Sequence, residues 1–167
     1  MKITVLGAGA GGSTLAKLAK LNGHEVIVWS RRNQESPDEV SLADAVVDAD
    51  VIVSAISMKG VADTVKRIQS LTLPTHTTLV TATKGSDPAT TQTPSQSLTA
   101  AFPSHSVVVL SGPNLSQEIY KGLPGATVIA SKDKTAAEAM QRVFSSEQFR
   151  VYTSSDPLGA ELGLVAV

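Results

Sequence analysis

The sequence contains no cysteine, so disulfide bonds, thiolate catalysis and cysteine-based metal sites are excluded. A chain without disulfides suits a reducing compartment, and we expect a cytoplasmic one. The three histidines, His24, His76 and His105, stand singly beside turn-like residues and lack the H-x-x-x-H spacing of a metal site. We therefore expect surface histidines and no bound metal.

Long apolar runs and excess charge are missing as well. No stretch approaches the ~20 apolar residues that a membrane-spanning helix needs, and the N-terminus lacks the pattern of a signal peptide. The formal net charge is −1, from 14 Lys+Arg against 15 Asp+Glu, so bulk charge does not attract nucleic acid or an anionic membrane. With 167 residues, 42% of them hydrophobic, the chain suits one globular domain with a sizeable core.

The chain is organised around a glycine-rich run, GAGAGG at positions 7–12, which follows the apolar segment ITVL and precedes STLAKLA. Strand, tight turn and helix in this order are the setting in which G-x-G-x-x-G binds a dinucleotide. Gly7 is expected to turn the chain at positive φ, Gly9 to let the backbone approach a ligand, and Gly12 to let the helix pack on the strand. The helix N-terminus then offers N–H groups to a pyrophosphate. The alternative is a glycine-rich loop with no ligand.

Apolar periodicity predicts strands and helices in alternation along the chain. The expected strands cover 3–6, 25–29, 50–56, 78–82, 106–110, 126–130 and 149–152. The expected helices cover 12–21, 61–71, 98–102, 115–121 and 135–144, with another beginning after Ser41 as its N-cap. This alternation is typical of an α/β protein with a doubly wound, mostly parallel sheet of the Rossmann type.

Two connections depart from the usual pattern of such sheets. The distance between the strands at 25–29 and 50–56 is short, so one α/β unit common in this fold is abbreviated or lost. The stretch 86–97 is rich in Thr, Ser and Pro, and we expect it to be mostly loop.

Two arginines follow the second expected strand, at Ser30-Arg31-Arg32. An acidic residue at this place would accept a hydrogen bond from the ribose 2′-hydroxyl of NAD. Guanidinium groups suit a 2′-phosphate better, because Arg presents a rigid fork of donors. We expect NADP to bind at least as well as NAD. The alternative is that Arg31 and Arg32 are solvated loop charges.

Lys84 stands where the fourth expected strand ends, in Thr83-Lys84-Gly85. Ligands of doubly wound sheets bind beyond the carboxyl ends of the strands. An ammonium group there can pair with a phosphate or polarise a carbonyl oxygen. The alternative is an exposed turn lysine.

Four motifs together resemble a known family. They are GAGAGGSTLA at 7–16, TKG at 83–85, LSGPN at 110–114 with Glu118 after it, and GAELG at 159–163. In this order they resemble the N-terminal domain of the bacterial NAD(P)-dependent glycerol-3-phosphate dehydrogenases, and the resemblance covers essentially the whole chain. It implies reversible hydride transfer between NAD(P)H and dihydroxyacetone phosphate, which gives glycerol 3-phosphate for phospholipid synthesis.

The resemblance also implies roles for individual residues. Lys84 would contact both the cofactor and the substrate phosphate, Gly112 and Asn114 would line the substrate side, and Ser116 the cofactor side. The remaining cofactor-binding residues would be those of the glycine-rich run and of the end of the second strand: Gly7, Gly9, Ala10, Gly11, Gly12, Arg31 and Arg32.

The sequence departs from the family in two places. Ala10 and Gly11 stand where the family has a serine and an aromatic residue, so we expect weaker nucleotide binding. The family continues into Leu-Lys-Asn, whose lysine donates a proton to the carbonyl, and here Val167 takes that position. We expect residues 1–155 to form the dinucleotide-binding domain and 156–167 to be the truncated start of an otherwise absent C-terminal helical substrate domain. Little turnover is expected from this chain alone.

Two alternatives remain. The chain could be a non-catalytic nucleotide-binding module that forms a homodimer through an exposed apolar flank, whose members are Leu158, Leu162, Leu164, Val165 and Val167. It could instead be a related short reductase of the ketopantoate or pyrroline-carboxylate type. The Ser-Gly-Pro-Asn motif argues against the reductase.

Overall fold

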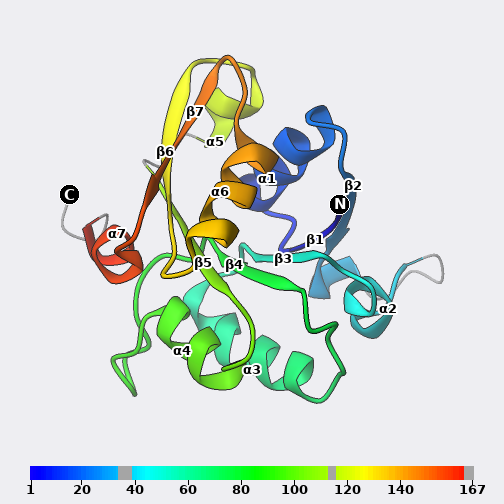
Figure 1. Ribbon diagram of the computed structural model, residues 1–167. Coiled ribbons are helices and arrows are strands. Elements are labelled where there is room, and N and C mark those ends of the chain that lie inside the picture. Colours follow the sequence, from blue (N-terminus) through cyan, green and yellow to red (C-terminus); the bar gives the residue numbers. More distant parts are fainter. Residues whose placement is uncertain (34–38, 113–115, 164–167) are drawn as a thin grey trace.

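The computed structural model describes residues 1–33, 39–112 and 116–163, which form one sheet with helices on both faces (Figure 1). The strands are β1 (Lys2–Leu6), β2 (Glu25–Trp29), β3 (Val51–Ser54), β4 (Thr78–Thr81), β5 (Val107–Ser111), β6 (Gly125–Ala130) and β7 (Phe149–Ser154). The helices are α1 (Ala10–Leu21), the 3-10 turn η1 (Arg31–Asn33), α2 (Leu42–Val46), α3 (Met58–Gln69), α4 (Pro94–Ala101), α5 (Ser116–Tyr120), α6 (Lys134–Phe144) and α7 (Pro157–Gly163).

The sheet has seven strands in the order β2-β1-β3-β4-β5-β6-β7. The strands from β2 to β5 are parallel to their neighbours, β6 is antiparallel to β5, and β7 is parallel to β6. The predicted doubly wound, mostly parallel sheet is therefore confirmed. Between β2 and β3 the described residues form only η1 and the five-residue helix α2. Since β3 pairs with the side of β1 opposite to β2, β2 is an edge strand of the described sheet.

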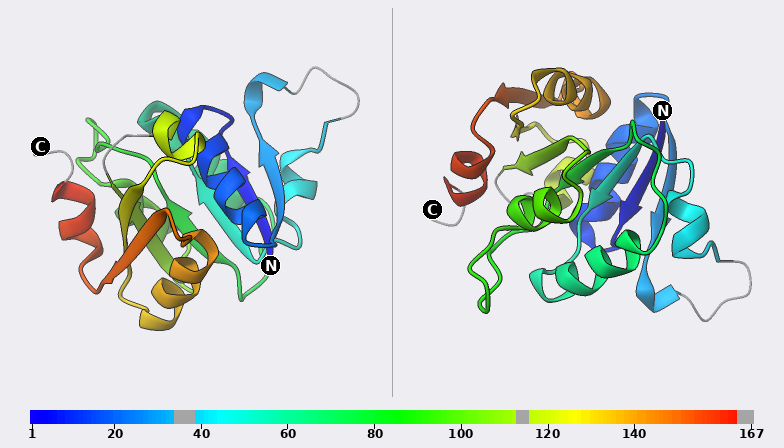
Figure 2. Two further views of the ribbon diagram at one scale, coloured as in Figure 1. Left: turned by 90° about the horizontal axis from the view of Figure 1, so that it is seen from above. Right: turned by 60° about the horizontal axis from the view of Figure 1, so that its bottom comes forward.

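Each face of the sheet has its own apolar core. Helices α1, α5 and α6 cover one face and α2, α3 and α4 the other (Figures 1 and 2). The first core joins the inward residues of α1 and α6 to alternate strand residues such as Val5 and Val53. The second joins α2, α3 and α4 to strand residues of opposite orientation, such as Leu6 and Ile52. Both sides of the central strands are thus buried, which explains their continuous apolar runs.

Helix ends follow the expected chemistry in most places. The Ser41 hydroxyl accepts a hydrogen bond from the Asp44 amide, so the predicted N-cap of α2 is confirmed. The loop predicted for 86–97 is wrong in its last four residues, because α4 begins at Pro94. Thr93 and Gln96 form a reciprocal capping box, and Pro94 occupies the first turn, where its missing N–H costs nothing. The Thr, Pro and Ser residues that suggested a loop instead form the N-terminal cap and first turn of a helix.

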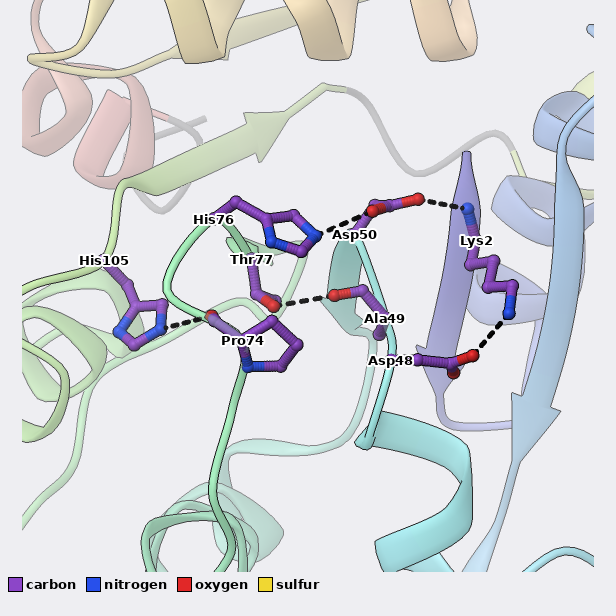
Figure 3. Close-up of polar contacts among 8 residues, drawn as sticks. All are labelled: Lys2, Asp48, Ala49, Asp50, Pro74, His76, Thr77 and His105. Atoms are coloured by element: carbon purple, nitrogen blue, oxygen red, sulfur yellow. Dashed lines mark hydrogen bonds and ion pairs between the residues drawn. The ribbon is translucent and has the colours of Figure 1, made fainter.

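The amino ends of the parallel strands carry a polar cluster (Figure 3). The Asp50 carboxylate accepts a hydrogen bond from the Lys2 amide at 2.7 Å and lies 2.8 Å from Nε2 of His76. His105 Nε2 lies 3.0 Å from the carbonyl oxygen of Pro74. His76 is exposed as expected, whereas His24 and His105 are half-buried and hydrogen-bonded. These histidines therefore form hydrogen bonds at the end of the sheet where the parallel strands begin, opposite to their carboxyl ends.

Replacing Asp50 by Asn should lower stability mainly at neutral pH. The Lys2 amide, and then His76, hold the pKa of Asp50 below its ordinary value of 3.8. Since the folded-state pKa is the lower one, this stabilisation is present above pH 3.8 and is lost as the pH falls through the folded-state pKa. Urea unfolding should show a deficit of about 1 kcal/mol at neutral pH and much less at about pH 2.5. A deficit of equal size at both pH values would contradict this account, and Glu147→Gln, an exposed acid, serves as control.

Candidate functional site

The loop between β1 and α1 is held by contacts that only glycine permits at position 7. Gly7 has φ +114°, as predicted, and its N–H donates to the carbonyl oxygen of Trp29 at 2.8 Å. A Cβ on residue 7 would lie 2.4 Å from the carbonyl oxygen of Ala55. The loop is therefore wedged between the ends of β2 and β3.

Gly12 brings α1 onto this loop. A Cβ on residue 12 would lie 2.0 Å from the carbonyl oxygen of Gly7 and 3.4 Å from Cγ1 of Val5. Gly12 therefore permits the close packing predicted for it, but the contact that requires glycine is with the loop at Gly7 and not with the strand. The helix starts at Ala10, two residues earlier than predicted.

The remaining residues of the run leave room for a ligand. No atom lies within 4 Å of the Cβ positions of Gly9 and Gly11, and Ala10 is exposed. Gly9 is the N-cap of α1 without a side-chain hydrogen bond, and the first turn has no acidic residue. An open, uncapped helix N-terminus of this kind suits an anion such as a pyrophosphate. This end of the protein therefore fits a dinucleotide.

Lys84 follows β4 at the same edge of the sheet. The buried Thr83 hydroxyl donates to the carbonyl oxygen of Ile56 at 2.9 Å, and Gly85 has φ +102°. The Thr83 hydrogen bond anchors the backbone just before Lys84, whose side chain is exposed. Sequence reasoning did not assign this anchoring role to Thr83.

Two cavities bring the site residues together. One, of about 100 Å³, is lined by Gly11, Lys84 and Gly112 along with apolar residues of α1 and β5. The other, of about 300 Å³, lies between Lys84, Ser111 and Glu161. The glycine-rich run and the ends of β4 and β5 thus face a common space. Among the described residues, no group of three His, Asp or Glu side chains could hold a metal ion.

Packing against β6 explains why residue 112 is a glycine. A Cβ there would lie 2.9 Å from Oγ1 of Thr127 and 3.1 Å from the carbonyl oxygen of Ala126, so packing against β6 requires glycine. Of the other two predicted site residues in this region, Asn114 lies outside the described residues and Ser116 is the first residue of α5.

Arg31 and Arg32 lie apart from Lys84. Both are exposed, and Arg31 Nη1 lies 3.3 Å from Oδ2 of Asp63 in α3. They follow β2, three strand spacings from β4, which is about 14 Å at about 4.8 Å per spacing. The two cationic groups can therefore serve opposite ends of one extended ligand.

Glu161 is a buried polar residue to which sequence reasoning gave no role. It is 7% exposed and accepts hydrogen bonds from the Ser95 amide at 3.0 Å and the Ser95 hydroxyl at 2.5 Å. The Ser111 hydroxyl donates to the carbonyl oxygen of Ala160 at 2.6 Å. These bonds fasten α7 to the N-terminus of α4 and to the end of β5. The sequence carried Glu161 inside a motif, but nothing in it identified Ser95 as its partner.

The glycine-rich loop lies where the strand order reverses. The strand β2 pairs with one side of β1, and β3, the next strand along the chain, pairs with the other side. Open α/β sheets bind their ligands at this switch point. The fold and the loop together define a Rossmann-type domain.

The family follows from sequence comparison. The family model described as NAD-dependent glycerol-3-phosphate dehydrogenase N-terminus matches residues 2–40 and 37–137. The chain therefore belongs to this family.

The chain is also similar to curated proteins named glycerol-3-phosphate dehydrogenase (NAD(P)+). It is 57% identical to that of Trichormus variabilis over 161 residues, which is 96% of this chain and 51% of the relative. The protein of Gloeobacter violaceus is 45% identical over 163 residues, which is 98% of this chain and 52% of the relative. The chain thus spans about half the length of the curated relatives it matches.

Solved structures support the fold. A crystal structure of glycerol-3-phosphate dehydrogenase from Coxiella burnetii superposes with a TM-score of 0.88 at 22% identity, covering 98% of this chain and 56% of that one. The glycerol-3-phosphate dehydrogenase of Plasmodium falciparum gives a TM-score of 0.87 at 19% identity, covering 97% of this chain and 54% of that one.

None of the helices in the described ranges is long and apolar enough to cross a membrane.

The neighbouring positions Gly11 and Gly12 should respond oppositely to alanine. Gly12→Ala places a Cβ into the Gly7 carbonyl and should destabilise the protein by about 2–4 kcal/mol. Gly11→Ala meets open space in the same helix and should stabilise it by about 0.5–1 kcal/mol. Urea unfolding without ligand measures both, and equal tolerance of the two changes would refute the packing argument.

Proposed function

We propose that the chain is the cofactor-binding half of a glycerol-3-phosphate dehydrogenase, which reversibly reduces dihydroxyacetone phosphate to glycerol 3-phosphate in the cytoplasm. The observation that carries the proposal is the common cavity of Gly11, Lys84 and Gly112 beside the open N-terminus of α1. The carboxyl ends of β2, β1, β3 and β4 would hold NADP or NAD, which would supply the hydride.

The two ends of the proposed cofactor site bind different chemical groups. At one end, Arg31 and Arg32 bind the adenosine phosphate as a rigid fork of donors. In the middle, the pyrophosphate meets the N–H groups at the start of α1. The loop residues that allow this approach are Gly7, Gly9, Ala10, Gly11 and Gly12.

The other end binds the small phosphate substrate. Lys84 is exposed, and the backbone before it is anchored through Thr83, so its ammonium can pair with the substrate phosphate while it contacts the cofactor. Gly112 and Asn114 line the substrate side and Ser116 the cofactor side. A lysine alone gives binding and orientation, and the alkoxide formed on reduction still needs a proton donor.

In an enzyme as long as the curated relatives, the proton donor would lie in the half that this chain does not span. We assign residues 1–155 to the dinucleotide-binding domain and 156–167, which include α7, to the start of a helical substrate domain. The Glu161–Ser95 and Ala160–Ser111 hydrogen bonds fix where α7 leaves the first domain. The chain alone therefore binds cofactor without turning over substrate.

A second candidate is a dimerising, non-catalytic module. The observation in its favour is that Leu158 and Leu162 on α7 are 43% and 47% exposed. The other members of the predicted apolar flank, Leu164, Val165 and Val167, lie outside the described residues. Light scattering that shows a strict monomer would exclude this candidate.

Cofactor binding can be measured through Trp29, which is the only tryptophan, 4% exposed, and bonded through its carbonyl oxygen to Gly7. Titration with NADPH should quench its fluorescence and raise nicotinamide emission by energy transfer. The same sample should not oxidise NADPH when dihydroxyacetone phosphate is added. Absence of binding for both NADPH and NADH at about millimolar concentration would refute the proposal, since enzyme KM values typically lie at about 1 mM or below.

Lys84→Met should weaken NADPH binding by about 5- to 20-fold, because a charge-assisted contact is lost. Lys132→Met is the matched control: this exposed lysine follows β6, whose carboxyl end lies at the opposite edge of the sheet. The control should bind as the parent does. Equal affinities for the parent and both variants would remove Lys84 from the cofactor site.

A further inference from the structure

The Arg31–Asp63 ion pair crosses the carboxyl end of β1. Arg31 lies in η1, directly after β2, and Asp63 lies in the second turn of α3, directly after β3. In the sheet, β1 stands between β2 and β3. The pair therefore links the turn that follows β2 to the helix that follows β3, and these two strands flank β1.

The contacts place both ends of the Arg31 guanidinium. Nη1 lies 3.3 Å from Oδ2 of Asp63, and Nη2 lies 3.4 Å from the position that a Cβ on Gly60 would take. Gly60 is buried in the first turn of α3. The guanidinium thus rests against α3 and is turned toward a carboxylate of the protein itself.

This ion pair is weak enough to be exchanged. The side chains of Arg31 and Asp63 are 55% and 58% exposed, and pairs this exposed contribute little to stability. One contact at 3.3 Å also leaves the other guanidinium N–H groups available. A phosphate can accept two of them side by side, so it competes well for Arg31.

Asp63 also acts on a phosphate through its charge. A carboxylate that reaches Arg31 lies within several ångströms of any phosphate bound to the same guanidinium, and like charges at that separation repel measurably even in water. Both effects act on a 2′-phosphate, and neither acts on the neutral 2′-hydroxyl of NAD.

We propose that Asp63 is a specificity-determining residue that competes with the 2′-phosphate of NADP for Arg31 and so brings the affinities for NADP and NAD closer together. This inference rests on the proposed function, because it assigns Arg31 to the adenosine end of the cofactor. Arg32, whose amide donates to the Ser30 hydroxyl at 3.3 Å, remains available beside it.

The test compares the dissociation constants of NADPH and NADH, measured by Trp29 fluorescence, in the parent and in Asp63→Asn. The variant should bind NADPH about 3- to 10-fold more tightly, with NADH changed less than about 2-fold. Salt at about 0.5 M should shrink the gain, since the charges involved are exposed. Asp48→Asn is the matched control: Asp48 is 57% exposed in its side chain and paired with Lys2 at the opposite edge of the sheet (Figure 3). Its NADPH/NADH ratio should equal that of the parent.

A double variant, Arg31→Met with Asp63→Asn, tests the competition directly. The gain from Asp63→Asn should shrink when Arg31 is absent, since no guanidinium is then left to release. Weaker NADPH binding by Asp63→Asn, an unchanged ratio, or an undiminished gain in the Arg31→Met background would each overturn the inference while leaving the proposed function intact. Failure of both dinucleotides to bind the parent would instead overturn the proposed function, and the inference with it.

Discussion

The close contact between residue 12 and the Gly7 carbonyl oxygen is the constraint on which the site depends. With a Cβ position only 2.0 Å from that oxygen, α1 can begin above the end of β1 only because residue 12 has no side chain. The same loop is held to β2 by the Gly7–Trp29 hydrogen bond and meets β3 at Ala55. One backbone arrangement therefore sets the positions of three strand ends relative to an uncapped helix N-terminus.

Strand direction then decides which residues can share a site. The parallel strands β1 to β5 bring Gly7, Arg31, Lys84 and Gly112 to one edge, because all their carboxyl ends lie there. The antiparallel strand β6 ends this series and carries Lys132 to the other edge. Helix α7 then brings Ala160 and Glu161 back to Ser111 and Ser95, beside the cavity that Lys84 lines. The last described helix thus lies against the cavity that Lys84 and Ser111 line.

Local sequence signals predicted most of the fold, and their failure at the start of α4 has an identifiable cause. The strand boundaries at β2, the cap at Ser41 and the positive φ of Gly7 were predicted correctly, because each depends on residues close together in the chain. The start of α4 was wrong because Thr93, Pro94 and Gln96 have the composition of a loop and the spacing of a capping box. The composition of this segment predicts a loop, whereas its residue spacing predicts a helix start. The hydrogen bonds in the structure are those of the helix start.

The sequence by itself determined the alternating α/β pattern, the glycine-rich turn and the presence of cationic residues after β2 and β4. Only the tertiary structure decided the partners of those residues. Arg31 and Asp63 are 32 positions apart, and Ser95 and Glu161 are 66 apart. Such pairs form because the strand order places distant segments beside each other, and strand order depends on packing across the whole sheet. Local periodicity does not encode strand order, so these pairs became visible only in the folded chain.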